Sequence, residues 1–128
     1  MIAEISWQNE DKTLLEVRYH EPLTVEDIID TITEIANVLD TVEHKVVLLV
    51  DMTDISTIPR NLLTAYPRIA KTRGVNHPNA AASYIVVDNR VIELITSIFN
   101  RMYASFQVVR SLEEAQRLAE ERVATLSD

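Results

Sequence analysis

The chain of 128 residues is long enough to bury a sizeable core, and we take residues 1–128 as a single domain. Hydrophobic residues make up 47% and charged residues 25% of the sequence, which excludes a disordered or fibrous chain. A net charge of -8 repels phosphate backbones, so nucleic acid is not an expected partner. The absence of Cys excludes disulfides and thiolate chemistry, and neither a signal peptide nor a membrane-spanning run is visible. We therefore expect a cytoplasmic protein.

Two strands and a helix are expected in the first forty residues. Apolar and polar side chains alternate over residues 2–8 and again over 13–19, with a polar turn between them, which predicts an antiparallel hairpin. Thr24 is a suitable N-cap, and apolar residues then recur at spacings of three and four as far as Leu39. This spacing predicts an amphipathic helix, and the connection is long enough for a right-handed crossover to a parallel strand.

The next stretch is the one around which we expect the fold to be organised. Residues 46–50 are all apolar and mostly β-branched, and Asp51 follows them directly. An unbroken run of this kind is typical of a parallel strand that helices cover on both faces. It therefore predicts the central strand of a sheet.

A second helix and another buried strand are predicted beyond it. Helical spacing returns over residues 62–74, where Gly74 is a plausible C-cap. Pro67 either kinks this helix or marks a later start. Residues 81–87 then form a second apolar run, which predicts another strand in the interior of the sheet.

The last third of the chain completes the pattern. Asp88 and Asn89 can cap a helix whose apolar stripe covers residues 91–102, and a short strand is expected at 106–109. A capping box that begins at Ser111 opens the final helix. The predicted fold is an α/β domain of order ββαβαβαβα, with four helices on a mixed, mostly parallel five-stranded sheet.

Residues 50–58 read Val-Asp-Met-Thr-Asp-Ile-Ser-Thr-Ile, which is an apolar strand end, an Asp and a short polar loop. This pattern resembles the anti-sigma-factor antagonist superfamily, the STAS or SpoIIAA-like domains, in which the loop leads to Ile-Asp-Ser-Ser-Gly at the start of a helix. Here Pro59, Arg60, Asn61 and Leu62 stand where the family has Asp, Ser, Ser and Gly. The second of those serines is phosphorylated in the signalling members, and its counterpart Asn61 cannot accept a phosphoryl group.

A wider likeness extends over nearly the whole chain. Two predicted strands end in Val-Asp, at residues 49–51 and 86–88. The last helix begins with Ser-Leu-Glu-Glu-Ala at 111–115. These features are similar to the bacterial SpoIIAA-like branch that is sometimes grouped with SEC14-like lipid carriers. The resemblance implies a SpoIIAA-like fold, together with either a protein-interaction or a carrier role.

Polar residues should gather at one rim of the sheet, because ligands of open parallel sheets bind beyond the carboxyl ends of the strands. The functional interpretation is a site for a protein partner or for a small polar or anionic ligand. Its residues are Asp51, Thr53, Asp54, Ser56, Thr57, Arg60, Asn61, Asp88, Asn89 and Arg90, with Arg110 and Ser111 after the last strand. The structural interpretation is that Asn89 and Ser111 cap helices and that the aspartates accept hydrogen bonds from loop amides.

Catalytic and metal-binding interpretations have less support in the sequence. Asp51 and Asp54 could hold a divalent cation, but the acidic pair and the Lys of a receiver-type phosphorylation site are missing. His20, His44 and His77 lie far apart, so a zinc site is not expected. No Ser lies in a nucleophile elbow, so a Ser-His-Asp triad is not expected either. We therefore expect no enzyme activity, no metal and no cofactor.

The apolar stripe of the helix at 91–102 is wider than packing on one sheet face needs. Core packing, a homodimer seam and a groove for a lipid-like ligand are three interpretations of Ile95, Ile98, Phe99 and Met102. We therefore expect a non-catalytic STAS-like interaction or regulatory domain that is homodimeric. The alternative is a carrier-like domain that binds a small apolar or amphiphilic ligand.

Overall fold

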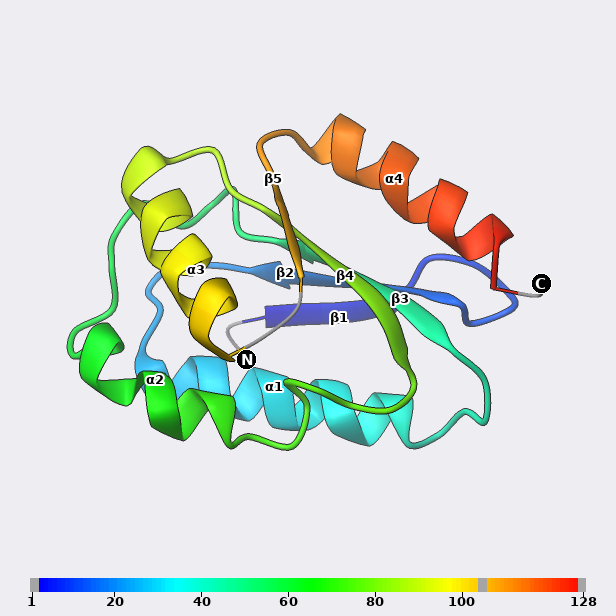
Figure 1. The fold of residues 1–128 in the computed structure, drawn as a ribbon, viewed down its shortest axis with the longest axis horizontal. Helices are drawn as coiled ribbons and strands as arrows, with labels where there is room; N and C mark the ends of the chain where they lie inside the picture. The colour runs from blue at the N-terminus through cyan, green and yellow to red at the C-terminus, as the bar shows by residue number, and fades with distance from the viewer. Residues whose placement is uncertain (1–2, 104–105, 127–128) are drawn as a thin grey trace.

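The computed structural model describes residues 3–103 and 106–126, with the backbone alone at residues 102 and 103. Its elements follow the predicted order ββαβαβαβα, and they confirm an α/β fold with four helices and five strands in these residues (Figure 1). The elements are β1 (Ala3–Trp7), β2 (Leu14–Tyr19), α1 (Val25–Leu39), β3 (Val46–Asp51), α2 (Leu62–Ala70), β4 (Ala80–Val86), α3 (Arg90–Tyr103), β5 (Gln107–Val109) and α4 (Leu112–Ala124).

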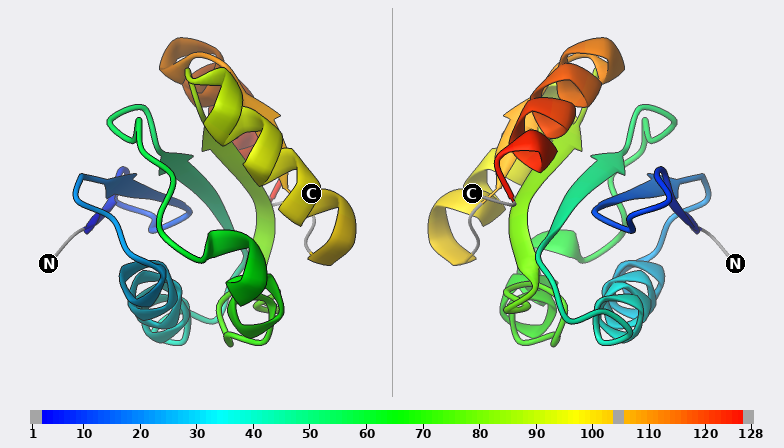
Figure 2. Two further views of the ribbon diagram at one scale, coloured as in Figure 1. Left: turned by 90° about the vertical axis from the view of Figure 1, so that its left-hand side faces the viewer. Right: turned by 90° about the vertical axis from the view of Figure 1, so that its right-hand side faces the viewer.

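The strands lie in the sheet in the same order as in the chain. β1 pairs with β2 in the antiparallel sense, and every later pair is parallel. Because right-handed crossovers that advance in one direction leave their helices on one face, α1, α2 and α3 share a face of the sheet. Figure 2 shows α1 and α2 side by side along that face, while α4 lies beyond the opposite face.

β3 is the central strand, as predicted. All six of its residues are buried, with exposed fractions between 0% and 9%. Val46, Leu48 and Val50 belong to the core beneath α1, whereas Val47 and Leu49 pack in the cluster that α4 covers. The unbroken apolar run thus reflects a strand with one helical layer on each side.

Local signals explain where two of the helices begin. At the start of α1 the Thr24 hydroxyl accepts a hydrogen bond from the Asp27 N–H at 3.1 Å, and the Thr24 N–H donates to the Asp27 carboxylate at 3.0 Å. At the start of α4 the Ser111 hydroxyl accepts from the Glu114 N–H at 3.1 Å. These bonds satisfy amides that the first turn of a helix leaves without partners.

The end of α2 differs from the prediction. The helix stops at Ala70 with Lys71 as its C-cap, so the assignment of Gly74 as a C-cap was wrong, and Pro67 lies inside the helix. Gly74 is buried because the loop after α2 passes close to α1. A Cβ atom at this position would lie 2.2 Å from the backbone oxygen of Ile32, so only glycine fits there without a shift.

Candidate functional site

Asp51 occupies the predicted rim at the end of β3, and its side chain closes the loop that follows. The residue is 3% exposed. Its Oδ1 accepts hydrogen bonds from the N–H and the hydroxyl of Thr53 at 2.9 and 2.7 Å. Its Oδ2 lies 3.3 Å from Arg18 Nε. This arrangement matches the structural interpretation, in which the aspartate satisfies loop amides.

The end of β2 supplies two rim residues that sequence reasoning did not place there. β2 runs parallel to β3, so its carboxyl end reaches the same edge of the sheet. Glu21 Oε1 accepts hydrogen bonds from the N–H groups of Ser56 and Thr57 at 2.8 and 2.9 Å, and from the Ser56 hydroxyl at 3.1 Å. These bonds favour the ionised carboxylate and lower the pKa of Glu21. Glu21 therefore holds the loop that carries the predicted partner-binding residues.

His20 lies between two carboxylates at the same edge. Its Nε2 is 2.9 Å from Glu4 on β1, and its Nδ1 is 3.0 Å from Asp54 in the loop after β3. Hydrogen bonds to Glu4 and then to Asp54 raise the pKa of His20. The direction of β2 was the signal that could have placed both His20 and Glu21 beside this loop.

The helix-capping interpretation is confirmed for two further rim residues. Asn89 Oδ1 accepts hydrogen bonds from the N–H groups of Val91 and Ile92 at 2.9 and 3.2 Å, while Ser111 caps α4. Arg110 makes two hydrogen bonds to the Glu93 carboxylate, at 3.1 and 3.0 Å.

The remaining rim residues lie on the surface. Arg60, Asp88 and Arg90 are exposed. Asn61 precedes α2 in the left-handed region, at φ 64°, and its side chain makes no capping hydrogen bond. A role for this rim in binding a ligand or partner stays a prediction, since many of its polar groups hold loops and helix ends.

Within residues 3–103 and 106–126, no group of three His, Asp or Glu side chains could hold a metal ion. His77 is buried and pairs with Asp40 at 2.7 Å, whereas His44 Nε2 lies 2.8 Å from the Lys12 carbonyl oxygen. Over the same residues, none of the helices has the length and apolar character required to cross a bilayer.

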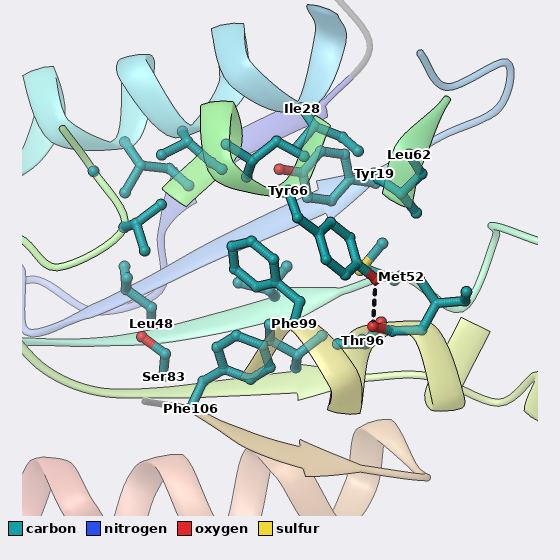
Figure 3. A pocket seen from close by; sticks show the side chains of 18 residues that line it. Tyr19, Ile28, Leu48, Met52, Leu62, Tyr66, Ser83, Thr96, Phe99 and Phe106 are labelled. Atoms are coloured by element: carbon teal, nitrogen blue, oxygen red, sulfur yellow. Dashed lines mark hydrogen bonds between the residues drawn. The ribbon is translucent and has the colours of Figure 1, made fainter. Parts of the chain in front are cut away.

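An apolar cavity that is partly open to solvent lies between the sheet and the three helices that share one of its faces. Its volume is about 180 Å³. Its lining comes from α1, α2, α3, strands β2 to β4 and the neighbouring loops, as Figure 3 shows from close by. The lining residues are Tyr19, Ile28, Ile32, Ile35, Leu48, Val50, Met52, Leu62, Tyr66, Ile69, Gly74, Val75, Ser83, Ile85, Ile95, Thr96, Phe99 and Phe106.

Aromatic rings form part of the cavity wall. The Tyr66 and Phe99 rings meet edge to face with centroids 5.0 Å apart, and Phe99 stacks with Phe106 at 6.5 Å. Figure 3 shows the three rings next to one another. The Tyr66 hydroxyl donates to the Ile95 carbonyl at 2.6 Å, which ties α2 to α3. The wall therefore combines aromatic surface with a hydrogen bond that fixes the two helices.

The described residues of the lining have few polar groups, and none of these groups is charged. Burial raises the pKa of Tyr19 far above its usual value, so the phenol stays neutral. The hydroxyls of Ser83 on β4 and Thr96 on α3 make no hydrogen bond to any other residue that the structure describes. An uncharged lining suits an uncharged molecule, because an unpaired charge is costly to bury.

α3 divides its apolar stripe between the cavity and the surface. Ile95 and Phe99 line the cavity, and Ile98 packs with them against the α2 cluster. The side chain of Met102, the fourth predicted interface residue, lies outside the described residues. Val91 and Leu94 are 53% and 61% exposed. The homodimer prediction is untested, and among the described side chains of α3 these two are the large apolar ones that are exposed to solvent.

Comparison of the chain with protein-family models, curated proteins and solved structures finds no match.

Proposed function

We propose that the chain is a non-catalytic binding domain that holds a small apolar or amphiphilic molecule between α1, α2, α3 and the sheet. The observation that carries this proposal is the cavity of about 180 Å³ with its apolar and aromatic lining. An apolar cavity of roughly 150 Å³ engineered into another protein binds benzene, so the volume suits one ring or a short branched chain. The cavity is partly open to solvent, so a small molecule can enter it.

The test is direct ligand binding. Native mass spectrometry of the purified protein should reveal a bound small molecule, and toluene should raise the melting temperature in a concentration-dependent way. Ser83→Ile, which places an apolar side chain in the cavity, should weaken toluene binding. Leu94→Asn, which changes an exposed apolar side chain outside the lining, should bind like the wild type.

Two outcomes would refute the proposal. One is a protein mass without ligand together with no response to toluene or to other compounds of similar size. The other is a response that Leu94→Asn abolishes and Ser83→Ile leaves intact, because binding would then occur on the exposed surface of α3.

The second candidate is the protein-interaction domain that the SpoIIAA-like resemblance implies, with a second copy of the chain as the partner. Exposed apolar side chains on α2, α3 and the loop before α2 support it: they are Ile58 at 37%, Leu63 at 57%, Val91 at 53% and Leu94 at 61%. Light scattering over a range of protein concentrations should show a dimer that Leu94→Asn weakens. A monomer at every concentration would exclude this candidate.

A further inference from the structure

The side chains that line the cavity also indicate the chemistry of the ligand. Ser83 lies in register with Leu48 of the central strand, and both side chains line the cavity with Val50 and Ile85. A hydroxyl is out of place on an apolar sheet face, where Val or Ala would pack without a polar group to satisfy. The Ser83 hydroxyl makes no hydrogen bond to a described residue and is not among the fully buried polar atoms, so a bound molecule can reach it from the cavity.

Thr96 presents a second hydroxyl of the same kind from α3. Threonine in a helix commonly donates to the carbonyl four residues earlier. Thr33 on α1 does so, with its hydroxyl 2.9 Å from the Ile29 carbonyl oxygen. The Thr96 hydroxyl makes no such bond, nor any other hydrogen bond to a described residue, and Thr96 lines the cavity. Both walls, the sheet and α3, therefore offer a hydroxyl that is available to a bound molecule.

We propose that the ligand is an uncharged molecule with a single hydrogen-bonding group, such as an alcohol, a phenol or a carbonyl compound, which Ser83 or Thr96 binds. This inference rests on the proposed function and specifies the ligand of that same cavity. The hydroxyls give one polar contact in a mostly apolar cavity, the usual way in which such sites orient a small molecule. Among the described residues the lining has no charged side chain to neutralise an ionised group, so carboxylates and ammonium ions should not bind.

Phenol and toluene provide the test, because they have nearly the same shape and differ by a hydroxyl in place of a methyl group. Their dissociation constants are measured for the wild type, Ser83→Ala and Thr96→Val. At least one variant should weaken phenol binding by about five-fold, the worth of one hydrogen bond, and leave toluene binding unchanged. Ser97→Ala is the control, since it removes a neighbouring hydroxyl on α3 that does not line the cavity.

A second pair of compounds tests the exclusion of charge. Benzyl alcohol and benzylamine share a shape, and the amine is protonated at pH 7. The alcohol should bind and the amine should not.

The outcomes separate the ligand class from the site. If phenol and toluene both bind and neither variant changes the phenol constant, or if benzylamine binds as tightly as benzyl alcohol, the ligand class proposed here is wrong and the cavity remains a binding site. If neither phenol nor toluene binds, the proposed function fails and this inference fails with it. If Ser97→Ala weakens phenol binding as much as the other variants do, the effect is not specific to the cavity and the inference is overturned.

Discussion

Filling the cavity should stabilise the protein, which is the reverse of the usual effect of enlarging a buried side chain. Ser83→Ile replaces a hydroxyl that makes no hydrogen bond to a described residue and adds a net three carbon groups on the cavity side of β4. Burial is worth about 0.8 kcal/mol per carbon group, and the loss of side-chain freedom costs about 0.5–1 kcal/mol. We expect the free energy of unfolding to rise by about 1.5 kcal/mol.

Urea denaturation followed by circular dichroism measures this change, and the midpoint should rise while the slope stays constant. Ala82→Val is the matched control, because Ala82 lies next to Ser83 in β4 but packs in the cluster covered by α4. An added methyl group on that packed face should give no comparable gain. If Ser83→Ile lowered the free energy of unfolding by 1 kcal/mol or more, about the least cost of overpacking, the space inferred between the sheet and α3 would not exist in solution.

Three further predictions test the packing and the rim. Gly74→Ala should lower the free energy of unfolding by about 1–3 kcal/mol in urea titrations, because its Cβ would contact a backbone oxygen of α1. Glu21→Ala should speed hydrogen exchange at the amides of residues 56–57, which its carboxylate binds. In the wild type the pKa of Glu21 is lowered, so the stabilisation from its hydrogen bonds is complete above the unfolded-state pKa of 4.5. It is lost as the pH falls through the pKa of the folded state. The pKa of His20 is raised, so the contribution of this residue to the free energy of unfolding is complete below pH 6.5. It is lost as the pH rises through the pKa of the folded state. An NMR titration of the His20 ring should therefore have its midpoint above 6.5, and Glu4→Gln should lower that midpoint.

Each of these predictions has a result that would contradict it. Asn76→Ala, in the same loop as Gly74 but exposed, should leave stability nearly unchanged, and an equal loss in both variants would disprove the close-approach argument. Unaltered exchange in Glu21→Ala would mean that the loop is held by other contacts. A His20 midpoint at or below 6.5 would show that the two carboxylates do not bind the ring in solution.

Local patterns in the sequence were sufficient for the elements of the fold. The apolar run of β3 and the Thr24 cap depend on neighbouring residues, so they can be read without knowledge of the tertiary structure. Gly74 was misassigned because its reason is a contact with Ile32, which belongs to another helix. A glycine required by a distant backbone and one required by a helix end look the same in a sequence.

The candidate site was less accessible to sequence reasoning. Ser83 was read as part of a buried strand, and its position in a cavity depends on how far the helices stand from the sheet, which no local pattern encodes. The surplus of apolar residues on α3 was the usable signal, and Ile95 and Phe99 do line the cavity. Glu21 bonds to a residue 35 positions away, so its role in holding the loop depends on β2 and β3 being neighbours.

The position of α4, which covers one face of the sheet and comes last in the chain, has a consequence for folding during synthesis. Strands β1 to β4 can pair in the order in which they leave the ribosome, since each one joins its predecessor. The apolar face formed by Val47, Leu49, Tyr84 and Val86 stays bare until α4, the last helix, has been synthesised. During that interval the nascent chain exposes an aggregation-prone apolar surface of the kind that chaperones bind. A stop codon just before residue 112 should therefore yield an insoluble product.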